Sequence, residues 1–549
     1  MEKERIEQFN TALMEYRAGK QSAERRVINA ENWWRLRNAV PESRNTEIGK
    51  DGGFTARTAW LHNIIVSKHA DAMDAFPEPD ILPREERDTA EAESLGDIIP
   101  CVLEQNGFEQ VYSDVMWQKL KTGTGIYKVV WDPAKLNGLG DISIVRVDLL
   151  NLFWEPGITD IQKSKYLFHT ELHDIDELEE TYPHIIGRLR GGSFNAARFA
   201  YDGSAVNAGK VTVAEVYYRR VIDGRRTLQY CKFCGDEVLY ATEDDPELYE
   251  RGLYDHAEYP FVFDPLFPVE GSPCGYGYVD LSENTQTAID LMMTAFIKNT
   301  MAGSVPRYFV RGDGGLNEEE FLDLSKPIVH TSGNLGEDAI RQITFSPLAG
   351  SYIQVLETAI EEIRHTSGNT ETATGNPGGG VTAASAIAAL QEASGKTSRD
   401  SAAASYRAYR QVIYLCIELI RQFYSLPRQF RITGKSGEPV FRAYSNEGLQ
   451  PAEQPDVFGT EAGCRLPVFD IRVRAQKKSA VTKLSQNELA LQLFRLGFFN
   501  PQAAPAALPA LNLMSFEGRD GVIRQVAENY ETARLLAAAA GGGENGERR

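Results

Sequence analysis

The stretch with the most suggestive chemistry is the glycine-rich segment TGNPGGGVTAASAIAALQEA, which runs from Thr374 to Ala393. A phosphate-binding loop of the Walker type needs Lys-Ser or Lys-Thr directly after its last glycine, because an ammonium must reach the terminal phosphates and a hydroxyl must hold magnesium. The spacing from Gly375 to Gly380 fits, but Val381-Thr382 follows. Since the lysine is missing and no strand pattern precedes the loop, the sequence favours a flexible connection between helices over a nucleotide site.

Cys231 and Cys234, in YCKFCGD, have the spacing of half a zinc site. A structural zinc ion needs four ligands, and the nearest further candidates are His256 and Cys274, with no second closely spaced pair. Two cysteines beside a hairpin turn account for the spacing without a metal. We therefore treat the pair as weak candidates for a metal site and predict no cofactor.

Two acidic runs, at 171–180 and 241–250, resemble divalent-cation sites in composition, but neither has the regular oxygen spacing of a calcium loop. Such runs are more often solvated helix faces. The eight histidines are dispersed, and neither the hydrolase motif G-x-S-x-G nor the zinc-protease motif H-E-x-x-H is present. The sequence predicts no catalytic residues and a protein that is not an enzyme.

With 549 residues, of which 42% are hydrophobic and 25% charged, the chain has the composition of a globular protein with several domain-sized bodies. Its net charge of −19 argues against a broad basic surface that wraps nucleic acid, because such surfaces gain affinity by releasing counterions from phosphates. The charge does not argue against a channel through which nucleic acid slides, where repulsion from acidic walls would help.

Cysteine usage and hydropathy bear on the compartment. The six cysteines are scattered along the chain, which favours a reduced, intracellular protein. The N-terminal segment MEKERIEQFNTALMEYRAGK is charged and lacks the apolar core of a signal peptide. The longest apolar run, from Val412 to Ile420, is too short to cross a bilayer. We expect a soluble protein made in the cytoplasm, with no membrane partner.

The first half of the chain is predicted to be α+β. Residues 1 to about 120 carry apolar residues at helical spacing, interrupted by the proline-rich segment 76–88. Strand patterns follow at 125–133 and 140–156. Asp223-Gly224 stands between two alternating runs, which is a strong signal for a β-hairpin.

Two helices are predicted to flank a small insert. The first begins near Ser282 as an N-cap, and the second begins at Ser346-Pro347. The insert, 305–345, holds two strand patterns, RYFVRG and PIVH, around a charged helical turn. Apolar residues on one face are Ile289, Met292, Met293 and Phe296 in the first helix, and Tyr352, Leu356, Ile360 and Ile363 in the second.

Behind the glycine-rich loop the sequence predicts its longest helix, about 383–424, which has no proline and a possible kink site at Gly395. A hairpin with its turn at 434–437 and a strand at 469–476 return the chain to β-structure. Helices are predicted from Lys483 to the end, broken at Asn500 to Pro509. The terminal AAAAGGGENGERR is predicted to be disordered.

In this order of elements the chain resembles the portal proteins of tailed double-stranded DNA bacteriophages, over nearly its whole length. The most telling segments are YDHAEYPFVFDPLFPVEGSPCGYGYVD, at 254–280, and TGNPGGGVTAASAIAALQEASGK, at 374–396. The first leads into the helix near Ser282, the second opens the longest helix, and neither is a catalytic signature. The resemblance implies a structural protein that assembles as a ring of about twelve subunits at one vertex of the viral capsid.

The resemblance also implies a multi-domain α+β portal fold with named regions. These are an α+β wing at 1–281, a first stem helix at 282–303, a small α/β clip at 304–345, a second stem helix at 346–366, a tunnel loop at 367–382, a long spine helix of the wing at 383–426, a β-rich return of the wing at 427–480, and crown helices with a disordered tail at 481–549.

The implied function is a channel through which double-stranded DNA enters and leaves the capsid without sequence specificity. The loop residues that would line its narrowest part are Thr374, Asn376, Gly378, Gly379 and Thr382. Lys298, the only lysine of the first stem helix, would form a basic ring at the channel or lie on the outer face.

The resemblance further implies partners for the clip. Its charged residues would face the large terminase subunit during packaging and a head-tail adaptor later; they are Arg307, Arg311, Glu318 and Glu319. The major capsid protein is an expected partner of the ring, and a scaffold protein is a further candidate.

Two other functions stay open from the sequence. Another ring-forming virion connector, such as a head-tail adaptor, would also be non-enzymatic, although adaptors are generally much smaller than this chain. A nucleotide hydrolase that uses the glycine-rich loop is disfavoured by the missing lysine.

Overall fold

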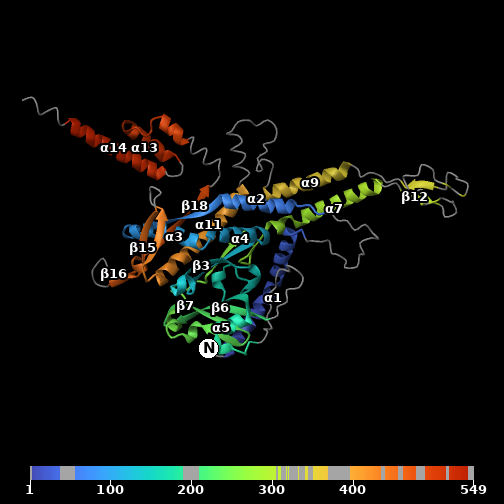
Figure 1. Ribbon diagram of the computed structural model, residues 1–549, viewed down its shortest axis with the longest axis horizontal. Helices are drawn as coiled ribbons and strands as arrows, with labels where there is room; N and C mark the ends of the chain where they lie inside the picture. Colours follow the sequence, from blue (N-terminus) through green and yellow to red (C-terminus); the bar gives the residue numbers. More distant parts are fainter. Residues whose placement is uncertain are drawn as a thin grey trace, which may run out of the picture. The chain divides into compact units, whose positions relative to one another are not determined.

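The computed structural model describes residues 3–36, 56–189, 209–304, 307–310, 340–343, 350–368, 396–433, 439–455, 462–477, 489–514 and 519–541, together with residues 317, 319, 320, 330 and 332. Helices and several small sheets are mixed along the chain, which confirms the α+β class (Figure 1). The chain forms two compact units, one of residues 1–73 and 77–474 and one of residues 74–76 and 475–549.

The largest described sheet of the first unit has five antiparallel strands in sequence order. Its longest hairpin turns at Asp223 and Gly224, whose φ angles of 49° and 77° are the positive values that a type I′ turn needs. The predicted hairpin is confirmed. The strands are β4 (Leu152–Trp154), β5 (Tyr166–Asp174), β6 (Lys210–Ile222), β7 (Arg225–Cys234) and β8 (Glu237–Ala241).

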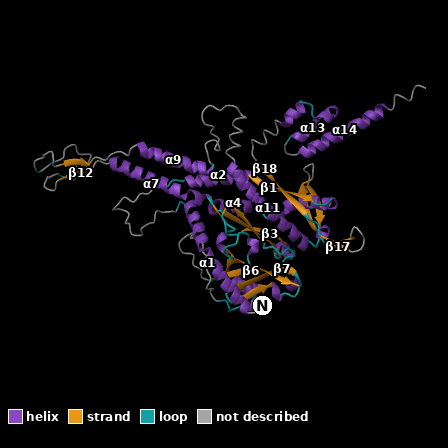
Figure 2. Cartoon of the chain, turned by 180° about the vertical axis from the view of Figure 1, so that it is seen from behind, coloured by secondary structure: helices purple, strands orange, loops and turns teal. Residues whose placement is uncertain are grey.

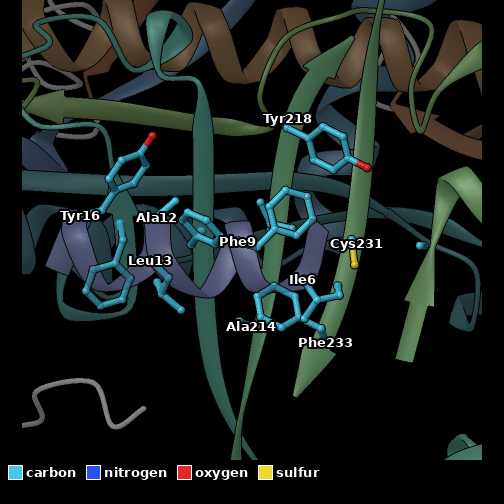
Figure 3. Packing of buried hydrophobic residues seen from close by; sticks show 13 residues of the cluster. Ile6, Phe9, Ala12, Leu13, Tyr16, Ala214, Tyr218, Cys231 and Phe233 are labelled. Carbon is cyan, nitrogen blue, oxygen red and sulfur yellow. The ribbon is translucent and has the colours of Figure 1, made fainter. Parts of the chain in front are cut away.

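Helix α1 (Lys3–Trp34) lies against one face of this sheet through apolar side chains at helical spacing. Phe9 is fully buried, and its ring centroid lies 5.4 Å from that of Tyr166 and 5.2 Å from that of Tyr218. Figure 3 shows Phe9 projecting from the helix among side chains of the strands. Burying one phenylalanine is worth about 2–3 kcal/mol, so this packing fixes α1 on the sheet.

A second sheet of the first unit has three antiparallel strands. Its order is β3 (Asp141–Arg146), β2 (Thr124–Asp132) and β9 (Phe261–Pro265). Helices α4 (Phe108–Thr122) and α11 (Lys396–Phe423) both contact β2 and β3, and Figure 2 shows the two helices near β3. The predicted longest helix is thus confirmed for 396–423, and its predicted first part, with Gly395, lies outside the described residues.

Strand β1 (Ala75–Pro83) occupies the proline-rich segment for which the sequence predicted only a break between helices. It pairs with β18 (Phe469–Lys477), which confirms the strand predicted at 469–476. Proline is tolerated because a strand of a two-stranded ribbon needs ladder hydrogen bonds on one side only. The ion pair of Arg84 with Asp470, at 2.8 Å, joins residues 386 positions apart, a distance over which local pattern carries no signal.

The remaining helices and strands of the first unit surround these sheets. Apart from α7, α9, β12 and β13, which are treated below, they are α2 (Trp60–Asp74), α3 (Thr89–Gln105), α5 (Ile175–Thr181), α6 (Leu248–Arg251), β10 (Phe267–Pro268), β11 (Gly275–Tyr276), β14 (Arg428–Thr433), β15 (Pro439–Tyr444), β16 (Ala452–Pro455) and β17 (Ala462–Arg465). Strands β14 and β15 pair antiparallel, as predicted for the hairpin around 434–437.

The second unit is a small helical cluster. Helices α13 (Ala504–Leu513) and α14 (Arg519–Gly541) pack around Leu511 and Val526. The predicted break from Asn500 to Pro509 is wrong at its end, because α13 begins at Ala504 and continues through Pro509. Pro505 lies in its first turn, where a missing N–H is tolerated, whereas Pro509 lies inside the helix. The prediction of disorder is wrong for 537–541, since the alanine-rich run extends α14, as the high helix propensity of alanine favours.

His256 is a buried ionisable group beside the three-stranded sheet. Its side chain is 7% exposed, and its ring stacks on Tyr254 with centroids 5.1 Å apart. Burial lowers the pKa of His256 from 6.5 to about 4. The unfolded chain takes up a proton on this histidine at a higher pH than the folded chain does. The contribution of neutral His256 to the free energy of unfolding is therefore complete above pH 6.5 and is lost as the pH falls toward 4.

We predict that His256→Phe, which keeps a ring against Tyr254, flattens the pH dependence of stability. Between pH 7 and pH 5 the wild-type free energy of unfolding should fall by about 2 kcal/mol more than that of the variant. Urea unfolding at the two pH values measures the difference. His365→Gln, at an exposed position of α9, is the control and should match the wild type. If the free energy of unfolding fell equally between pH 7 and pH 5 in His256→Phe and in the wild type, His256 would not be the source of this pH dependence.

Candidate functional site

Two long helices of the first unit run side by side and carry a small hairpin beyond their ends (Figure 1). They are α7 (Tyr278–Ser304) and α9 (Gly350–Ser367). The hairpin consists of β12 (Arg307–Val310) and β13 (Ile340–Ile343), paired antiparallel. The strand predicted at RYFVRG is confirmed as β12, whereas its partner β13 was not predicted, and the predicted strand PIVH lies outside the described residues apart from His330.

The start of α7 differs from the prediction. The helix begins at Tyr278, and Ser282 lies inside it as a buried residue rather than at its N-cap. The backbone N–H of Gly277 donates to Oδ2 of Asp280 at 2.8 Å, so a carboxylate of the first turn meets the chain where it enters the helix. The predicted start of the second helix, Ser346-Pro347, lies outside the described residues.

The inner part of this helix pair is buried in a shared apolar cluster. Ile289 of α7 and Ile363 of α9 are 0% and 1% exposed, and they pack with Leu61 and Ile65 of α2. Partly buried Trp34 and Trp117 bring α1 and α4 into the same cluster. The predicted apolar faces are therefore confirmed for their inner halves, where they join five helices.

The outer part of the pair exposes large apolar side chains. On α7, Leu291 and Met301 are 53% and 60% exposed, and on α9, Tyr352 and Val355 are 55% and 57% exposed. Phe296 and Ile353 are also exposed. Single exposed apolar residues are ordinary, but such a group on one helix pair marks an interaction surface.

Close backbone contact fixes the segment that leads into α7. Gly123 ends α4 with a φ of 88°, and a Cβ there would lie 2.3 Å from the carbonyl carbon of Tyr276. At Gly275 a Cβ would lie 2.5 Å from the carbonyl oxygen of Phe267. The N–H of Gly275 donates to Oγ1 of Thr124 at 2.9 Å. Only glycine permits such close approach, which explains the sequence Gly275-Tyr276-Gly277 in the segment 254–280.

A fully buried ion pair holds α11 against the body. Nζ of Lys119 in α4 donates to Oδ1 of Asp264 in β9 at 2.7 Å, and both side chains are 0% exposed. Nζ also donates to Oγ of Ser405 at 2.8 Å and to the carbonyl oxygen of Ser401 at 3.2 Å, both in α11. Ser405 in turn donates to Oδ2 of Asp264 at 2.9 Å. All three ammonium donors are used, as a buried charge requires.

The first turn of α11 has an anchor of its own. Nζ of Lys68 in α2 donates to Oγ of Ser398 at 2.9 Å, and Ser398 donates to Oδ2 of Asp71 at 2.7 Å. The described chain before the glycine-rich loop ends with α9, whose last residue Ser367 is buried, and the described chain after it begins with this anchored turn of α11. The predicted channel residues Thr374, Asn376, Gly378, Gly379 and Thr382 themselves lie outside the described residues.

The other predicted site residues are only partly described. Lys298 lies on α7 and is exposed, and Glu319 is exposed beyond β12. Arg307 begins β12, while Arg311 and Glu318 lie outside the described residues. The structure therefore does not bring these residues together in one described site.

The two cysteines at zinc spacing point into different apolar clusters. Cys231 packs with α1, whereas Cys234 packs with Leu178 and Leu239 on the other side of β7. Burial raises the pKa of Cys231 to about 12 and that of Cys234 to about 11, which disfavours the thiolates that bind zinc. Among the described residues, no group of three or more histidine, cysteine or acidic side chains could hold a metal.

Lys119→Met should strongly destabilise the first unit, because it leaves the buried carboxylate of Asp264 without its counter-ion. We expect a loss of about 3–5 kcal/mol in the free energy of unfolding, measured with urea. The double variant Lys119→Met with Asp264→Asn should recover part of that loss. Arg84→Met, which breaks an exposed ion pair, should cost less than about 1 kcal/mol. Similar losses for Lys119→Met and Arg84→Met would show that the buried pair is not the anchor described.

Comparison with known proteins identifies a family. A family model described as phage P22-like portal protein matches residues 73–259 and 223–540. These residues include the five-stranded and three-stranded sheets, helices α7, α9 and α11, and most of the second unit. No curated protein matches the chain. Among the described residues, no helix is long and apolar enough to span a membrane. The matched stretches run through most of the sequence, so the chain belongs to the P22-like portal proteins of phages, structural head-tail connectors at the capsid vertex.

Proposed function

We propose that the chain forms a closed ring of about twelve copies around a channel for double-stranded DNA, and that α7 and α9 are its stem. The observation that carries this proposal is the exposed apolar surface on the outer half of the helix pair. In a ring each copy contacts its neighbours through two different surfaces. We infer that Leu291 and Met301 of α7 contact Tyr352 and Val355 of α9 in the next copy.

The regions of the subunit follow from this assignment. The wing is proposed for 1–281, with the spine helix and the β-rich return adding 383–480, and the crown for 481–549. The clip is proposed for 304–345 and the tunnel loop for 367–382. The boundary between wing and stem moves back to Tyr278, where α7 begins.

The glycine-rich loop suits the narrowest part of such a channel. Its Gly, Asn and Thr residues present small polar groups, and glycine changes conformation at low cost. DNA that must slide is best touched without base-specific contacts, which would stall it. The anchors of α11 at Ser398 and Ser405 would carry the force on the loop into the wing. Lys298 would add a basic ring if it lies on the side of α7 that faces the channel. The net charge of −19 would keep DNA from adhering to the channel wall.

The clip is proposed to dock the large terminase subunit during packaging and a head-tail adaptor afterwards, with the capsid protein contacting the ring elsewhere. Charged side chains of Arg307, Arg311, Glu318 and Glu319 would serve in these contacts. Besides the pairing of β12 with β13, the described part of the clip has a contact in which Oε2 of Glu320 accepts hydrogen bonds from the backbone N–H and from Nδ1 of His330, both at 2.8 Å.

Glutamate placed in the exposed apolar surface should block ring formation without unfolding the subunit. Met301→Glu and Val355→Glu would each bury an unpaired charge between copies, and we expect assembly to require at least about tenfold more protein. Analytical ultracentrifugation measures the assembly, and circular dichroism checks the fold. Gln354→Glu adds the same charge at an exposed polar position of α9 and should have a smaller effect. Wild-type assembly of both apolar-site variants would refute the proposed interface.

Deletion of Asn376 to Gly380 should impair DNA packaging or retention while ring assembly stays normal. A variant that keeps the length of the loop and replaces these residues with alternating serine and glycine should package nearly as the wild type does, because it remains small and polar. DNA protected from nuclease in a packaging reaction measures the effect. Unchanged packaging by the deletion would count against the channel role of the loop.

A further inference from the structure

A cavity of about 420 Å³ opens in the first unit between α1, α4 and the chain that follows β3. Its wall combines the indole rings of Trp34 and Trp117 with the side chains of Gln118, Asp114, Asp148 and Arg146. The proposed ring and channel make no use of this cavity. Its size is sufficient for one large side chain.

The aromatic part of the wall is rigid. The ring centroids of Trp34 and Trp117 lie 5.3 Å apart at 47°. Each is stacked against a histidine of α2: the ring centroid of His62 lies 4.0 Å from that of Trp34, and the centroid of His69 lies 3.7 Å from that of Trp117, both nearly parallel. Stacked rings with fixed orientation give a flat, electron-rich surface, and indole is the side chain that attracts cations best.

Gln118 supplies an acceptor that nothing in the described chain uses. The residue is 5% exposed, and Oε1 is buried without a hydrogen-bond donor. Buried polar atoms are nearly always paired, so an unpaired acceptor that lines a cavity indicates a donor brought by a ligand.

The carboxylates of the wall favour the same kind of ligand. Glu31 is already bonded to Arg35 at 2.9 Å and to Lys121 at 2.6 Å, so this acid is occupied. Nζ of Lys121 lies 5.5 Å from the ring centroid of Trp34, so it is a second cation of the wall that opposes a positively charged ligand. Asp114 uses Oδ1 for the amide of Gln110, and Asp148 uses Oδ1 for the N–H of Leu150. Their Oδ2 atoms have no donor among the described residues.

We propose that this cavity binds the guanidinium group of an arginine side chain presented by another polypeptide. A guanidinium is planar and can stack on Trp34 and Trp117, and it carries five N–H donors for Gln118, Asp114 and Asp148. Arg146 at the rim is exposed and has the same sign of charge, so it opposes this ligand. An anion would be attracted by Arg146 and would leave Gln118 unpaired.

The proposal is tested on the purified full-length chain with N-acetyl-arginine amide as probe and the isosteric, neutral N-acetyl-citrulline amide as control. Two of the chain's six tryptophans line the cavity, so tryptophan fluorescence reports binding, and saturation-transfer NMR detects it independently. We expect saturable binding of the arginine probe with a dissociation constant of about 1 mM, near the value for a ligand of this size. The citrulline probe should bind at least about tenfold more weakly.

Variants separate this site from weak binding elsewhere. Gln118→Met and Asp114→Asn should each weaken the arginine probe about fivefold or more, and Arg146→Gln should strengthen it. Glu109→Gln makes the same charge change on the exposed side of α4 and should leave the affinity unchanged. No saturable binding, equal binding of the citrulline probe, or weaker binding by Arg146→Gln would each overturn the proposal. None of these measurements depends on ring assembly.

Discussion

The helix pair α7 and α9 is buried in the apolar core at one end and exposes apolar side chains at the other. The packing of the first unit around the buried end depends on this arrangement. At the inner end, Ile289 and Ile363 share a core with α1, α2 and α4. At the outer end, residues such as Met301 and Val355 remain exposed although their chemistry favours burial. Among the described residues nothing covers them, which supports the proposal that further copies of the chain do so.

Two kinds of interaction connect the helix pair and α11 to the rest of the first unit. Glycines 123 and 275 let the backbone before α7 press against the end of α4, where any side chain would collide. On the other side of the glycine-rich loop, the buried pair of Lys119 and Asp264 ties α11 to α4 and β9 through Ser405. The same helix, α4, therefore contacts both the segment that leads into α7 and helix α11.

Much of this could be predicted from the sequence where the signal is local. The hairpin at Asp223-Gly224 is set by turn chemistry, and the apolar faces of the stem helices follow from helical spacing. Spacing does not say what covers a face, so the sequence left open whether these faces are buried within the chain or pack on a neighbouring copy. Lys119 gave no local signal, because its partners lie 145 and 286 positions away. The start of α7 was misplaced because Ser282 has the residue type of a cap, whereas Gly277 and Asp280 provide the contact.

Assembly of the chain as a ring is tested most directly by its native mass, together with negative-stain images of the same sample. We predict a particle of about twelve subunits with a central hole, formed by the purified protein or on addition of its capsid partners. A protein that stays monomeric at high concentration and also with capsid partners present would contradict ring assembly, because the exposed apolar surface of α7 and α9 would then have no second copy to cover it.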